Sequence, residues 1–67
     1  MTTTILKTVS VTATLTVQQA EAFSEFLKRV GLSHYETLAV DSLEAYSMLE
    51  AGEIIRSSLA EQGFSPR

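Results

Sequence analysis

Pairs of acidic residues at helical spacing are the first candidates for chemistry in this sequence. Glu21 and Glu25 stand four residues apart, and Glu50 and Glu53 stand three apart, so each pair shares one face of a helix. Two carboxylates can act as general acid and general base only where their surroundings differ, for example where one of them is buried. Both pairs fall on polar helix faces. The pattern therefore predicts solvated surface and no catalytic pair.

The single histidine, His34, is the other candidate for acid–base or metal chemistry. No arrangement of serine and aspartate near it indicates a nucleophile with its base. A metal site would need Glu36, Asp41 or Glu44 to converge on the imidazole, but acidic residues at such places favour helix capping. The glycines are isolated, so no glycine-rich phosphate loop is present. We expect no enzyme, no cofactor and no metal site.

The composition is that of one small, acidic domain without cysteine. The 67 residues include eight acidic and five basic side chains, for a net charge of −3, and 45% of them are hydrophobic. Such a chain should fold, yet one of this length hides only about 60% of its unfolded surface and cannot be stapled by disulfides. We therefore expect a homodimer. The acidic balance lowers the expectation of nucleic-acid binding, and the lack of a leader or membrane span predicts a cytoplasmic protein.

The segment 3–15 reads as one long β-strand. Apolar residues alternate there with threonine and serine, and no Gly, Pro, Asn or Asp interrupts the run. The apolar row consists of Ile5, Val9, Val11, Ala13 and Leu15. Nothing later in the chain can pair with this strand, and a lone strand leaves its N–H and C=O groups without partners. We predict an α+β fold whose strand pairs antiparallel across the homodimer.

Three helices are expected after the strand, each following a residue that favours an N-cap. These caps are Thr16, Ser33 and Asp41, and the helices are predicted at 17–30, 34–40 and 42–62 within a single domain, 1–67. The first helix should bury Ala20, Phe23, Leu27 and Val30, and the last should bury a stripe that includes Ala45, Gly52 and Leu59. A glycine inside a helix costs about 1 kcal/mol relative to alanine. Gly52 therefore predicts the close approach of another backbone.

A strand followed by two helices, with Gly31-Leu32-Ser33 between them, resembles the ribbon-helix-helix family over residues 9–46. Dimers of that family lay a two-stranded ribbon in the major groove of DNA, where outward strand residues read the bases. The resemblance implies base contacts for Thr8, Ser10 and Thr12, and phosphate contacts for Lys28 and Arg29. The strand residues can hydrogen-bond but bring no positive charge, and the last helix is long for that fold.

Further segments carry a closer likeness, which covers residues 11–67. They are AFSEFLKRVG at 22–31, Tyr35, AVD at 39–41, EAY at 44–46 and LAE-x-GF-x-PR at 59–67. Together they resemble a family of small uncharacterised bacterial proteins. Members of such families often travel on phages, plasmids or other mobile elements. The likeness implies one compact domain and transfers no activity.

Two main hypotheses of function follow. The first is a small acidic, non-enzymatic protein-binding module, a regulator or inhibitor encoded by a mobile element, including the anti-CRISPR kind. Its candidate contact residues are Leu43, Tyr46, Glu50, Glu53, Ile54 and Glu61. It would act by strand addition or by acidic mimicry of nucleic acid. The alternative is a DNA-binding transcriptional regulator of the ribbon-helix-helix type, and a third reading is an accessory subunit whose strand completes a larger assembly.

Overall fold

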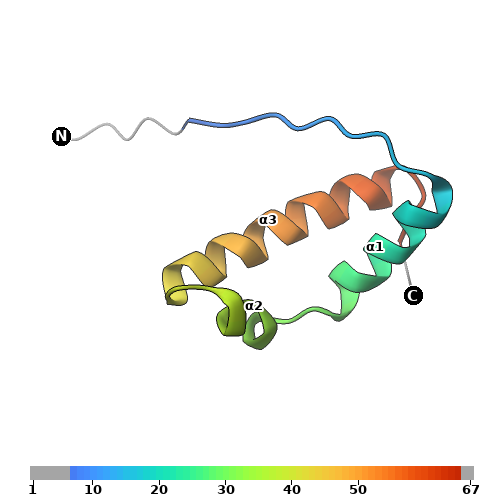
Figure 1. The fold of residues 1–67 in the computed structure, drawn as a ribbon. Coiled ribbons are helices and arrows are strands. Elements are labelled where there is room, and N and C mark those ends of the chain that lie inside the picture. The colour runs from blue at the N-terminus through green and yellow to red at the C-terminus, as the bar shows by residue number, and fades with distance from the viewer. Residues whose placement is uncertain (1–6, 66–67) are drawn as a thin grey trace.

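A computed structural model describes residues 7–65, which contain three helices and no strand. The helices are α1 (Val17–Arg29), α2 (Leu32–Leu38) and α3 (Ser42–Glu61). Both α1 and α3 end one residue before the predicted limits of 17–30 and 42–62. Figure 1 shows α3 as the long element of the fold, with α1 beside its C-terminal part and α2 beside its N-terminal part. The fold is therefore one long helix flanked by two shorter ones.

The predicted strand is the main correction. Residues 7–15 belong to no sheet and are all exposed, with Val9 86% and Val11 84% accessible. Figure 1 shows this segment leaving α1 without a neighbouring strand. Alternation of apolar residues marks two faces, but a strand forms only where a second segment accepts its backbone hydrogen bonds, and residues 7–65 offer none. The α+β fold with an antiparallel strand pair was therefore wrong, and the described chain is all-helical.

The residues assigned to that strand divide into two groups. Val9, Val11, Ala13 and Leu15 lie in the exposed segment before α1. Ile5, like the rest of 3–6, lies outside the described residues.

Side-chain caps at α1 and α3 follow the sequence closely. The Thr16 hydroxyl accepts a hydrogen bond from the Gln19 N–H at 3.0 Å, and the Gln19 side chain accepts one from the Thr16 N–H at 2.9 Å. At α3, the Asp41 carboxylate accepts from the Glu44 N–H at 2.8 Å. These bonds satisfy N–H groups that the helix itself cannot pair, and they confirm both predicted caps.

The short helix α2 begins earlier than predicted. Gly31, not Ser33, is its N-cap, and the predicted span of 34–40 is shifted toward the N-terminus. The Nδ1 atom of His34 accepts a hydrogen bond from the Gly31 N–H at 2.9 Å. The imidazole thus lies three residues after the N-cap, the position that Glu36 would have if Ser33 were the cap. Either side chain lies three residues after a candidate cap, so local spacing alone did not decide between them.

The core between α1 and α3 is thin and consists of few residues. Ala20, Leu27 and Leu59 form it, Phe64 packs against it, and Ser24 is buried beside it. The Ser24 hydroxyl donates to a carbonyl of its own helix at 2.9 Å, which makes its burial tolerable. Two of the three buried residues of α1, Ala20 and Ser24, have small side chains.

Phe23 and Val30 were wrongly predicted to share the buried face of α1. Phe23 is 41% exposed and Val30 is only half-buried, because α1 turns Ser24 toward α3 in their place. The neighbouring Phe26 is 53% exposed.

Gly52 makes room for side chains from both flanking helices. A Cβ atom at this position would lie 2.5 Å from the hydroxyl oxygen of Tyr35 and 3.5 Å from a methyl group of Leu27. The first distance is a clash, whereas the second is ordinary contact. The predicted close approach is therefore present, but a tyrosine side chain makes it and not another backbone.

This contact predicts a stability effect that reverses with the residue at position 35. Gly52→Ala in the natural chain should lower the free energy of unfolding by about 1 kcal/mol, because the displaced Tyr35 outweighs the gain in helix propensity. In a Tyr35→Phe background the hydroxyl is absent, and the same substitution should raise stability by up to about 1 kcal/mol. Urea denaturation at one protein concentration measures both effects. Equal changes in the two backgrounds would refute the clash.

Candidate functional site

The predicted partner-binding residues of α3 share its solvent side. Leu43, Tyr46, Glu50 and Ile54 recur at spacings of three and four, with Glu61 further along the same line and Glu53 at its flank. Leu43 is 77% exposed and Ile54 68% exposed, whereas Ala45 and Leu59 on the opposite side are buried. We call these six residues the outer face of α3. The line from Leu43 to Glu61 is about 27 Å long at the rise of an α-helix.

The outer face combines apolar contact area with negative charge. Glu53 forms a loose ion pair with Arg56, whose Nη1 lies 3.6 Å from the carboxylate. Glu50 and Glu61 form no ion pair within residues 7–65. Charges at the rim of an interface keep part of their hydration and attract an opposite charge, and apolar side chains between them gain from being covered. This arrangement can bind a basic surface that has an apolar centre.

A second exposed apolar surface lies on α1 and extends to α2. The rings of Phe23 and Phe26 stack with their centroids 5.7 Å apart and their planes 9° apart. Two shallow hollows meet at this pair and share Ala22 and Phe26; one reaches Leu15, and the other reaches Val30 and Leu38. We call this surface the aromatic face; it consists of Leu15, Ala22, Phe23, Phe26, Val30 and Leu38.

Sequence reasoning missed the aromatic face because it gave Phe23 to the core. A signal was present, since two phenylalanines three residues apart cannot both join the stripe that contains Ala20 and Leu27. The helix therefore has two apolar sides, and only one of them can face α3.

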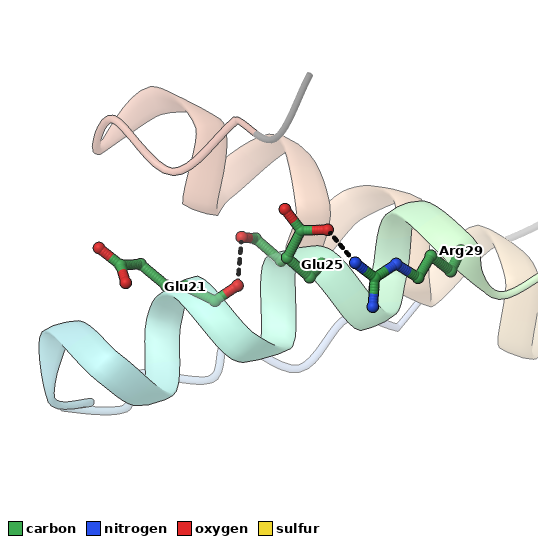
Figure 2. A network of polar contacts seen from close by, with 4 residues as sticks. Glu21, Glu25 and Arg29 are labelled. Carbon is green, nitrogen blue, oxygen red and sulfur yellow. Dashed lines mark hydrogen bonds and ion pairs between the residues drawn. The ribbon is translucent and has the colours of Figure 1, made fainter.

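Several candidates for acid–base and metal chemistry form local hydrogen bonds or ion pairs. His34, Asp41 and Glu44 take part in capping hydrogen bonds. The carboxylate of Glu25 forms an ion pair with Arg29 at 3.0 Å, and it does not face Glu21 as a catalytic pair of carboxylates would (Figure 2). Within residues 7–65, no three side chains of metal-binding type converge. In the same range, no helix combines the length and apolar character that crossing a membrane requires.

The residues of the ribbon-helix-helix reading are not assembled into a ribbon. Thr8, Ser10 and Thr12 lie in the exposed segment before α1, where no strand forms. Lys28 and Arg29 occupy the last turn of α1, and Arg29 is engaged by Glu25. The two-stranded ribbon that would enter a DNA groove is thus missing from residues 7–65. Binding to DNA stays a prediction.

Comparison with known proteins identifies one family. A family described as being of unknown function, DUF7706, matches residues 1–67. The predicted likeness to an uncharacterised family is confirmed, while a bacterial or mobile-element origin stays a prediction. No curated protein and no solved structure matches the chain.

The exposure of the outer face predicts that its apolar residues contribute little to folding. Leu43→Ala and Ile54→Ala should each change the free energy of unfolding by less than about 0.5 kcal/mol. Leu59→Ala, the matched change on the buried side of the same helix, should cost about 2 kcal/mol or more. Chemical denaturation compares the three. A cost at Leu43 or Ile54 as large as that at Leu59 would mean that the outer face is already covered in the folded protein.

Proposed function

The chain belongs to the DUF7706 family of unknown function, and we propose from its surface that it is a small acidic, non-enzymatic protein-binding module. The outer face of α3 is the observation that carries this proposal. Leu43, Tyr46 and Ile54 are large hydrophobic side chains that are each more than half exposed, and glutamates lie among and beside them. Large exposed apolar side chains grouped on one face are typical of interaction surfaces.

The partner that suits this face is a protein with a basic surface. Aromatic and aliphatic residues supply the contact area at the centre of an interface, and charges at its rim guide the encounter and exclude wrong partners. Tyr46 offers an apolar ring with a polar tip, which is a common anchor at such centres. A basic surface that ordinarily holds nucleic-acid phosphates has the required charge, so the chain would compete with nucleic acid for it.

Occupying such a surface makes the chain a regulator or inhibitor of its partner. We propose that the chain acts in the cytoplasm and is encoded by a mobile element, as inhibitors of the anti-CRISPR kind are. Strand addition, the other route expected from the sequence, would require the exposed segment 7–15 to become a strand on the edge of the partner's sheet. Acidic mimicry through α3 uses a face that is already formed, and it is the route that we propose.

A pair of charge reversals tests this function. Glu50→Lys with Glu61→Lys inverts the outer face, and Glu21→Lys with Glu36→Lys changes the net charge equally on α1 and α2. Proteins captured by the immobilised natural chain from a lysate of the organism that encodes it would be identified by mass spectrometry. Their affinities for each variant would then be measured with purified partner. We expect the outer-face pair to weaken binding about tenfold or more, or about 1.4 kcal/mol, and the control pair to leave it nearly unchanged.

Circular dichroism of both variants establishes that the helices are retained. A partner that binds both variants as tightly as the natural chain would contradict a role for the outer face. Equal losses in both variants would mean that net charge alone, and no particular surface, governs capture.

A further inference from the structure

The aromatic face differs from the outer face of α3 in its charge. Among residues 7–65, no acidic side chain lines its two hollows, and Arg29 is the one arginine or lysine that does. Its centre is the stacked pair Phe23 and Phe26, both about half exposed. Depletion of charge and enrichment in aromatic residues are the marks of the core of a protein interface.

The surface area of the chain allows for an interface of ordinary size. The accessible surface is 5925 Å², whereas the scaling for folded monomers gives about 4,200 Å² at a mass of 7.3 kDa. The excess is about 1,700 Å², part of it from the exposed segment 7–15, and a stable dimer needs about 800 Å² from each partner. The chain thus exposes more surface than a compact monomer of its mass, and the half-exposed rings of Phe23 and Phe26 belong to this surface.

The core of the monomer shows why this burial is needed. Among residues 7–65, the buried apolar side chains are Ala20, Leu27, Ala45 and Leu59, two of which are only methyl groups. The sequence contains no cysteine, so no disulfide supplements this core. Domains of this size commonly gain the missing stability from association. A second copy is the one partner present wherever the chain is made.

Charge decides which face the second copy uses. Two outer faces brought together would place Glu50, Glu53 and Glu61 near the same glutamates of the other copy, and like charges so close are repulsive. The aromatic face carries no such penalty. A twofold arrangement is self-complementary there, because antiparallel α1 helices with their axis between residues 24 and 25 set Phe23 of one copy opposite Phe26 of the other. Ala22 leaves room for the approaching rings.

We propose that the aromatic face docks a second copy of this chain, through an antiparallel pair of α1 helices related by a twofold axis. The Leu15 end of one face then meets the Leu38 end of the other. This interface uses helices that the structure describes and requires no β-ribbon. It leaves both outer faces of α3 free, so the proposal stands or falls independently of the function proposed above.

Sedimentation velocity over a dilution series tests the proposal in the intact chain. We expect the sedimentation of the natural chain to give a mass of twice 7.3 kDa. Phe26→Glu should raise the dimer dissociation constant about thirtyfold or more, because it puts two charges into the centre of the interface. Ile54→Glu, the same kind of change on the outer face of α3, should alter it by less than about threefold.

Cross-linking provides a second test that keeps both phenylalanines. The chain has no cysteine, so Ala22→Cys and Ser57→Cys each introduce one thiol, the first on the aromatic face and the second on the solvent side of α3. A short bis-maleimide should join two copies of the Ala22→Cys chain and leave the Ser57→Cys chain uncoupled. This result decides the matter if Phe26→Glu fails to fold.

Three outcomes would overturn the proposal. One is a monomer at every concentration, which would mean that nothing, or another part of the same chain, covers the aromatic face. Another is a dimer that Ile54→Glu dissociates while Phe26→Glu does not. The third is coupling through position 57 in preference to position 22.

Discussion

Gly52 has no side chain, so the side chains of Tyr35 and Leu27, from two different helices, pack next to the backbone of α3 there. The rest of the fold depends on this contact. A helix of seven residues such as α2 has no stability of its own in water, so it is held where its side chains meet α3. Leu27 of α1 also lies next to Gly52. Because α1 approaches through Ala20, Ser24 and Leu27, its phenylalanines are left outside.

Local signals predicted much of the helical structure. The capping residues at Thr16 and Asp41 act within three residues of themselves, so the sequence already contains everything that fixes these helix starts. The structure of the segment before α1 is not fixed locally. A strand requires a second segment to pair with, and that segment need not be near it in the sequence. Alternation revealed the two faces of residues 7–15 but carried no information about a second strand. That is why the fold class was wrong while the helices were nearly right.

The two candidate surfaces differ in how far the sequence could reveal them. The outer face of α3 was predicted because Leu43, Tyr46 and Ile54 fall away from a core stripe that is clear along that helix. The aromatic face required knowing which of two apolar sides of α1 meets α3. That choice rests on packing against Gly52 and on the ability of Ser24 to satisfy its hydroxyl inside its own helix. Neither condition can be recognised from the spacing of apolar residues in the sequence.

On α3, the residues that hold the fold together and those that meet the solvent stand on opposite sides of one helix. Ala45, Gly52 and Leu59 are constrained by their neighbours, whereas Leu43 and Ile54 touch little else. Substitutions on the solvent side thus escape the selection that acts on folding. The solvent side of α3 can therefore accept changes of side chain while the packing on its other side, and with it the fold, is kept.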